Sequence, residues 1–221
     1  MPKSNTWIAP LIFLATLAPG AFAFNDSSPL SMVYSEGWRP APDMGLRDFA
    51  AAAATGRASY QLGNCQLKLR TLQDLRRNKE TVGAAVLMDP LSGGVVPVHG
   101  ISVRSGDGAG WLEGAAQSLA SSGVRMHGTA NTPGQRDIDI ALRMAHVWAA
   151  GMNLYSHVVL VATVPQSSGS RDKRYHGFGS KMNMNSFNFE FMTTLNLAMN
   201  DALELYAIDL RDACAGKAIP E

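Results

Sequence analysis

Alternation of apolar and polar residues predicts a half-buried strand over residues 64–72 and a longer one over residues 137–149. In the longer strand we expect one apolar face, formed by Ile138, Ile140, Leu142 and Met144. The opposite face would carry Asp137, Asp139 and Arg143. Residues 157–164 form a nearly continuous apolar run, which is typical of a central strand. The chain then turns through a polar, basic hairpin tip at 167–173 and returns as a strand at 174–178.

The remaining strand signals are weaker. Short strands are predicted at 101–104 and 124–127. Residues 82–98 are apolar but are interrupted by Pro90, Gly93, Gly94 and Pro97. We therefore expect a loop there, holding at most one short strand.

Apolar residues at helical spacing predict two helices. The first is centred on residues 111–119, is entered from Ser105–Gly108 with Ser or Asp as a cap, and stops at Gly123. The second runs from Ser186, its expected cap, to Ala213. Its expected core stripe consists of Phe187, Phe191, Leu195, Ala198, Met199, Ala202, Leu205 and Tyr206. A second apolar edge, expected to stay exposed for a partner, consists of Phe189, Met192 and Leu203.

This order of elements predicts the fold class. Strands precede and follow the first helix, and a long helix ends the chain. The arrangement indicates an α+β fold in which two helices, including the long C-terminal one, pack on one face of a largely antiparallel or mixed sheet.

The N-terminal residues resemble a secretory signal rather than part of the fold. Lys3 precedes a short apolar run, and Ala21-Phe22-Ala23 has the small-x-small form of a cleavage site. We divide the chain into a signal peptide (1–23), a flexible leader (24–59) outside the main core, an α+β envelope domain (60–214) and a tail (215–221). The leader includes an alanine-rich stretch, 46–54, that favours a short helix. We expect a periplasmic protein that does not span the membrane after cleavage.

Composition adds one restriction. The chain has 19 basic and 18 acidic residues, and the predicted signal contains Lys3 and no acid, so the remainder is formally neutral. A neutral chain lacks the electrostatic attraction that nucleic-acid binding requires, and nucleic acid is not an expected partner.

Cys65 and Cys214 are the only cysteines. An exported chain enters an oxidising compartment, in which an even number of cysteines favours a disulfide. We predict that the two are bridged, joining the first strand to the end of the last helix. The alternative is a pair of buried free thiols.

Several short motifs resemble those of a known family. The chain is similar to the YajG-type periplasmic lipoproteins, which are themselves similar to auxiliary components of ABC-type envelope transport. The resemblance covers about Gln61 to Ala213 and implies no catalytic residue; the chain has no lipobox cysteine, and its two cysteines are additional to the family pattern. The matching segments are Asp74-x-Arg76, Ile101–Arg104 with the following Ser105 and helix, Gly123, Asp137–Leu142, Val158–Thr163, Arg174–Gly177, Leu195-Asn196 and Leu203.

Signals for chemistry are weak. The glycine-rich stretch 106–110 has neither dinucleotide spacing nor a P-loop lysine, so it indicates a helix entry. No GxSxG motif is present, and Asp137 and Asp139 suit the solvent face of a strand. The five histidines show no HExxH pattern, and we predict neither a metal site nor a cofactor. We therefore predict no enzymatic activity.

The strongest binding signal is a group of basic residues around the predicted hairpin: Arg171, Lys173, Arg174 and Lys181, with Tyr175 and Phe178 between them. Such a group suits an anionic lipid headgroup, an acidic glycan or a protein partner. The alternative is a solvated hairpin tip, which is the usual outcome for a short charge cluster. We predict an accessory or adaptor protein that binds an envelope protein complex. The alternative is a periplasmic carrier or sensor of a small anionic or lipidic ligand.

Overall fold

The computed structural model describes residues 28–35, 62, 65–88, 95–126, 133–150, 153–167, 169–182 and 188–219, with no side-chain description for 85–88 and 95–99. The predicted signal at 1–23, the predicted helix at 46–54, the Ser186 cap and Phe187 lie outside these residues. The elements are β1 (Leu67–Asp74), β2 (Thr81–Met88), β3 (Val95–Ser102), α2 (Asp107–Ala116), the 3-10 helix η1 (Gln117–Ser122), β4 (Arg136–Ala150), β5 (Asn153–Gln166), β6 (Gly169–Met182) and α3 (Asn188–Cys214).

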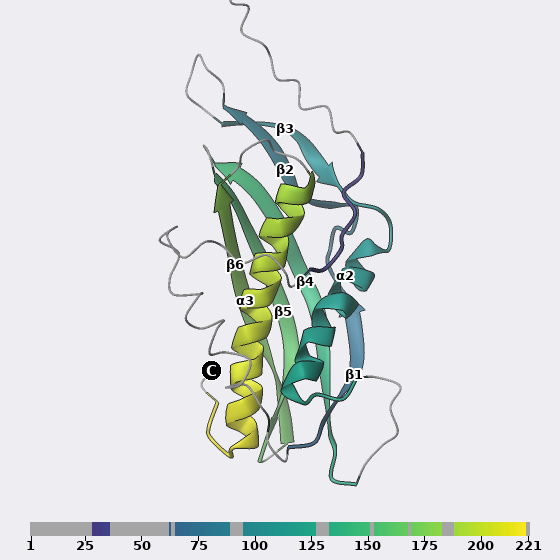
Figure 1. The fold of residues 1–221 in the computed structure, drawn as a ribbon, viewed down its shortest axis with the longest axis vertical. Coiled ribbons are helices and arrows are strands. Elements are labelled where there is room, and N and C mark those ends of the chain that lie inside the picture. Colours follow the sequence, from purple (N-terminus) through teal and green to yellow (C-terminus); the bar gives the residue numbers. More distant parts are fainter. Residues whose placement is uncertain are drawn as a thin grey trace, which may run out of the picture.

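The six strands of the described part of the chain form one mixed sheet, and α2 and α3 cover the same face of it (Figure 1). Along most of the sheet the order is β3-β2-β4-β5-β6. β1 and β2 both pair in parallel with β4, β1 along its first half and β2 near its end. β4, β5 and β6 are antiparallel neighbours. The predicted α+β class is confirmed. Neither described helix has the length and apolar character needed to cross a membrane.

The loop expected at 82–98 is wrong. Residues 81–88 and 95–102 form the antiparallel strands β2 and β3, and Ile101 belongs to the end of β3. The glycines and prolines of this stretch of sequence concealed two strands, and Pro97 fits in β3 because an edge strand tolerates a missing N–H group. The strand expected at 124–127 is reduced to one bridge between Arg125 and Lys68.

A register shift in β4 changes the side on which one predicted core residue lies. Ile138, Ile140 and Leu142 are buried as expected, but the β4–β5 register shifts between Leu142 and Met144. A bulge inserts one extra residue and so reverses the alternation beyond it. Met144 is therefore exposed, contrary to our expectation, and Ala145 and Val147 take the buried positions.

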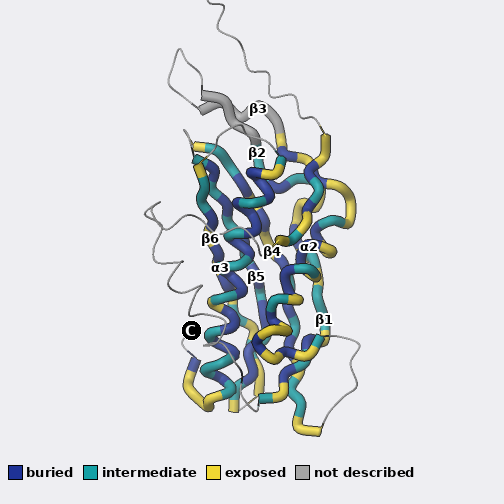
Figure 2. The backbone as a smooth tube through the Cα atoms, viewed as in Figure 1, coloured by how far each residue is buried: buried dark blue, intermediate teal, exposed yellow. Residues whose placement is uncertain are grey.

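Helix α3 packs closely on β5 and β6, and its inward side is continuously buried (Figure 2). Gly177 and Gly179 allow this approach, since a Cβ atom at Gly177 would lie 1.9 Å from the carbonyl oxygen of Ala198. Ser156 of β5 donates to the carbonyl of Thr194 on the same helix. One predicted stripe residue, Leu205, is instead exposed on the helix flank.

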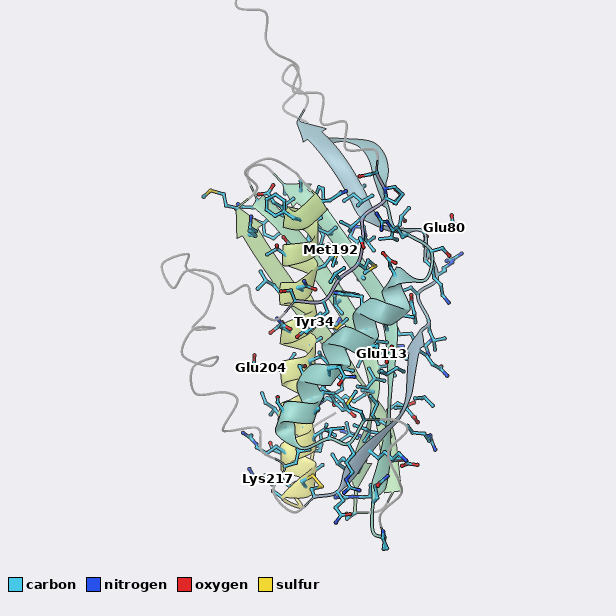
Figure 3. The ribbon with its side chains drawn as sticks, turned by 45° about the vertical axis from the view of Figure 1, so that its right-hand side comes forward. Tyr34, Glu80, Glu113, Met192, Glu204 and Lys217 are labelled. Carbon is cyan, nitrogen blue, oxygen red and sulfur yellow. A yellow bond between two sulfur atoms is a disulfide. The ribbon has the colours of Figure 1, made fainter. Side chains whose placement is uncertain are left out.

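The apolar edge expected on α3 is largely covered. Phe189 is exposed, but Met192 and Leu203 are buried, with Met192 near the start of the helix (Figure 3). The covering elements are α2, whose Trp111 donates to Asn196, and the segment 28–35, whose Tyr34 donates to Asn200. The partner surface predicted at this edge is therefore wrong.

The segment 28–35 also corrects our expectation that the leader stays out of the main core. Leu30 and Met32 are buried in it, and Leu30 bridges to Val103 beside β3. Asp107, predicted as a possible helix cap, instead accepts from the backbone N–H of Met32, and Gly106 occupies the cap position with a φ of 85°. The predicted stop at Gly123 is confirmed, with a φ of 104°.

The predicted disulfide is confirmed. Cys65 and Cys214 are bonded, with their Cα atoms 5.5 Å apart. The bond connects the residues before β1 to the last residue of α3. It thereby joins the two ends of the folded domain on the helix-covered side of the sheet.

Candidate functional site

The predicted basic group is divided between the two faces of the sheet. β6 extends over 14 residues, so the expected hairpin tip is strand, and successive side chains point to opposite faces. Arg171, Lys173, Tyr175 and Lys181 point toward α3, whereas Arg174 lies on the opposite face. The five residues therefore do not form one binding surface.

Three of these side chains attach β6 to the C-terminal part of the chain. Lys173 lies 2.9 Å from the Asp209 carboxylate, which also accepts from the Tyr175 hydroxyl at 2.7 Å. Burial, together with the hydrogen bond to Asp209, raises the pKa of Tyr175 well above its ordinary value. Arg171 donates to the carbonyl of Ile219, a buried residue of the tail. These contacts give the residues a structural role.

Lys181 is similarly occupied. Its ammonium group lies 3.1 Å from the carboxylate of Glu190, in the first turn of α3. The Glu190 side chain is almost completely buried and that of Lys181 largely so. A buried carboxylate needs a partner of opposite charge. Lys181 therefore neutralises the Glu190 carboxylate rather than binding an external anion.

The glycine-rich stretch and Asp139, which we considered as candidates for chemistry, also make structural contacts within the fold. In the glycine-rich stretch, a Cβ atom at Gly108 would lie 2.1 Å from the Arg76 guanidinium, which is paired with Asp74 at 2.8 Å. Asp139 is held by Arg70 and accepts from Thr71 at 2.7 Å. The hydrogen bond from Arg70 keeps the pKa of Asp139 below its ordinary value. This carboxylate is ionised near neutral pH and unsuited to acid catalysis.

The sheet face opposite the helices carries a cluster that sequence reasoning missed. Most outward-pointing residues of β4, β5 and β6 there carry aromatic, imidazole or thioether side chains, and Val159 and Ser180 lie among them. No helix of the described part of the chain covers this face (Figure 1). We call the cluster the aromatic patch; it consists of Met144, His146, Trp148, Tyr155, His157, His176, Phe178 and Met182.

Strand register brings the members of the patch together. His146 is opposite His157, which is opposite Phe178 on the next strand, and Trp148 is opposite Tyr155. The rings of His157 and Phe178 stack with centroids 4.4 Å apart and planes 6° from parallel. Trp148 and Tyr155 stack at 5.8 Å. Residues far apart in the sequence therefore form one continuous surface.

The patch has a neutral centre. His157 Nε2 and His176 Nδ1 lie 3.1 Å apart, a hydrogen bond in which one ring donates and the other accepts. Burial lowers the pKa of His157, and the neighbouring His176 and His146 lower it further. His157 is therefore uncharged at neutral pH. Among the described residues, no three His, Cys, Asp or Glu side chains gather as metal ligands.

Arginines lie next to the patch. Arg143 precedes Met144 in β4 and Arg174 precedes His176 by two residues in β6, both exposed. Beside the patch, an open groove of about 390 Å³ runs between β4 and the region around the start of β2. Its lining includes Arg76, Arg77, Arg143 and His146 and contains no carboxylate.

Comparison with known proteins shows similarity only at low identity. No family model matches the chain, and no curated protein matches it. An uncharacterised protein of known structure is 10% identical, with a TM-score of 0.41 over 69% of this chain and 94% of that one. Protein XCC0632 from Xanthomonas campestris, of the DUF330 family, is 12% identical, with a TM-score of 0.40 over 68% and 88%. The hypothetical protein CT253 from Chlamydia trachomatis is 7% identical, with a TM-score of 0.35 over 69% and 99%.

Proposed function

We propose that this chain is a non-catalytic accessory or adaptor protein of the cell envelope, exported to the periplasm, that binds a partner protein through the aromatic patch. The signal-like N-terminus and the Cys65–Cys214 disulfide support an oxidising, exported setting. The resemblance to YajG-type lipoproteins supports a role in envelope maintenance or transport. The proposal that the protein binds a partner through this face rests on the aromatic patch.

The composition of the patch resembles the centre of a protein interface. Such centres are enriched in aromatic residues and Met and depleted of Lys, Asp and Glu. The patch contains Trp, Tyr, Phe and two Met side chains and none of those charged residues. Phe178, on the outermost strand of the patch, stacks on His157 and is 58% exposed. Covering these side chains would remove apolar surface from water, the main source of affinity in protein association.

The surrounding charge restricts the partner. Arg143 and Arg174 are the exposed charges that border the patch on β4 and β6, and Arg77 lines the adjoining groove. A partner with an apolar centre bordered by carboxylates would complement both features. We therefore infer a protein partner with an acidic rim.

Replacing Phe178 by Ser is expected to weaken partner capture at least about tenfold, because exposed aromatic side chains that become buried as anchors of an interface typically contribute more than 1.4 kcal/mol. The fold should survive, since the side chain is mostly exposed. The measurement compares stoichiometric capture from native envelopes by tagged wild-type and variant protein. Phe189→Ser is the matched control, since Phe189 is 61% exposed but lies on α3. Equal loss with both variants, or no loss with Phe178→Ser, would contradict the proposal.

One observation favours the second candidate function, a carrier or sensor of a small anionic ligand. The groove beside the patch has the volume of a small-molecule site and is bordered by arginines. If it carries anions, Arg77→Ser and Arg143→Ser should each abolish saturable binding of inorganic phosphate or a short-chain phosphatidate in calorimetry. Arg174→Ser, outside the groove lining, is the control. Absence of saturable binding by the wild-type protein would exclude this candidate for those ligands.

A further inference from the structure

The outer edges of the sheet differ in how they are protected. The edge of β1 is covered by Arg125, whose backbone exchanges hydrogen bonds with Leu67 and Leu69 at 2.9 and 2.8 Å. Leu30 pairs with the outer side of β3 at its end. Its backbone N–H donates to the carbonyl of Ser102, and its carbonyl accepts from the N–H of Arg104. No described strand or bridge pairs with the outer side of β6. Unpaired strand edges readily pair with another chain. Leu30 pairs only with the end of β3, so β3 and β6 both have outer edges that the described residues leave largely unpaired, and β6 is the one whose edge side chains are described.

One hydrogen bond identifies which groups of β6 point outward. The Phe178 N–H donates to Asp201 of α3 at 2.9 Å, so it points away from β5. Phe178 and His157 are then a non-hydrogen-bonded antiparallel pair, a type that alternates with hydrogen-bonded pairs. The β5–β6 register has no shift, so every second residue of β6 counted from Phe178 is also in a non-hydrogen-bonded pair with β5. Asp172, Arg174 and His176 therefore also direct their N–H and C=O groups outward.

The side chains at this edge are complementary to themselves. Asp172 and Arg174 are both exposed and lie on the open face of the sheet. Asp172 accepts from Thr163 through one oxygen, and Arg174 has no ion-pair partner among the described residues. If two copies of β6 pair antiparallel about a two-fold axis at Lys173, Asp172 of each lies opposite Arg174 of the other. Opposite charges in this position stabilise strand pairing.

We propose that two copies of this chain associate edge to edge through β6, with Asp172 of each copy paired with Arg174 of the other in one continuous sheet. The interface is isologous, as in most homodimers. Pairing ends at His176 on each copy, because the next outward N–H group, that of Phe178, is already bonded to Asp201.

Two further features agree with this register. Leu205 lies one helical turn after Asp201 on the same flank of α3 and is 43% exposed. A second copy at the β6 edge would bring the two flanks together and cover both leucines. Lys173 faces its own copy across the axis on the helix side, where Asp209 neutralises each ammonium group.

Such a dimer would place two aromatic patches side by side on one face of the shared sheet. The dimer does not require the patch to bind a partner, but it assigns Arg174 to the dimer interface and leaves Arg143 and Arg77 beside the patch for an acidic partner. If both hold, a partner with two binding surfaces would bind by avidity.

A charge-exchange series tests the register. We expect sedimentation equilibrium of the full mature chain to give a monomer–dimer equilibrium. Asp172→Arg or Arg174→Asp alone places like charges opposite each other at two symmetric positions, which should raise the dissociation constant at least about tenfold. The double variant Asp172→Arg with Arg174→Asp restores opposite charges in this register and should recover most of the wild-type association.

The outcomes separate the alternatives. A wild-type chain that stays monomeric throughout the micromolar range would overturn the proposal. A dimer unaffected by all three variants, or one that the double variant fails to restore while its thermal unfolding matches the wild type, would also overturn it. Arg174→Pro is a second check, since it removes an outward N–H that no described strand uses. This variant should be monomeric and folded; if it remains dimeric, the edge is not the interface.

Discussion

Removing the Cys65–Cys214 disulfide is expected to lower the free energy of unfolding by up to about 5 kcal/mol. The bond joins residues 149 positions apart. A cross-link across so long a loop restricts the unfolded chain strongly, which raises its free energy relative to the folded state. It also keeps the end of α3 beside the start of β1. The loss should appear in urea unfolding of the Cys65→Ser, Cys214→Ser double variant.

The reduced wild-type protein provides the matching control. A reductant should destabilise the wild type by a similar amount and leave the double variant unchanged. If the two oxidised proteins differ by less than about 1 kcal/mol, the loop-closure account is wrong, because a bridge of this span should contribute several times that amount. Free thiols at both positions in exported protein would contradict the bond itself.

Replacing Gly177 by Ala is expected to destabilise the fold by about 3 kcal/mol, the upper part of the usual range for overpacking. The added methyl group would lie 1.9 Å from the carbonyl oxygen of Ala198 and 2.5 Å from the backbone nitrogen of Ala202. Both atoms belong to the backbone of α3, so relief requires the helix to move away from β6. That movement would loosen the interface in which Tyr175 contacts Asp209.

Gly110→Ala is the matched substitution, since a Cβ atom at Gly110 meets nothing within 4 Å. Alanine favours helix, so this variant of α2 should gain up to about 1 kcal/mol. Thermal and urea unfolding of both variants would measure the difference. A Gly177→Ala protein within about 0.5 kcal/mol of the wild type would mean that α3 does not pack this closely on β6, since even mild overpacking exceeds that value.

Much of the fold was predictable where local pattern and burial agree. Alternation located β1 and β4, a continuous apolar run located β5, helical spacing located α3, and the compartment argument led to the disulfide. The β2–β3 hairpin was missed because Pro97 and its neighbouring glycines mark loops in most contexts, whereas an edge strand accommodates them. The exposure of Met144 depends on a bulge, which inverts the side-chain alternation without any strong local signal.

The candidate site was less predictable because it depends on register. The basic residues of 171–181 are close in sequence, but strand alternation separates Arg174 from Lys173 and Tyr175. In the aromatic patch, His146, His157 and Phe178 are instead distant in sequence and become neighbours through strand pairing. His146 and Trp148, and likewise Tyr155 and His157, are two positions apart in sequence, so each pair points to one face of its strand. Only the strand register shows that the two pairs share the same face of the sheet.

Site-specific photo-crosslinking in the native envelope tests the central claim most directly. A photoreactive phenylalanine analogue at Phe178 samples the open face, and the same analogue at Phe189 samples the helix side at equal exposure. We predict one heterologous protein cross-linked from position 178 and absent from position 189, with the yield reduced when Tyr155 is replaced by Arg. Equal cross-linking from both positions, or none from position 178, would contradict the assignment of the aromatic patch as the binding surface.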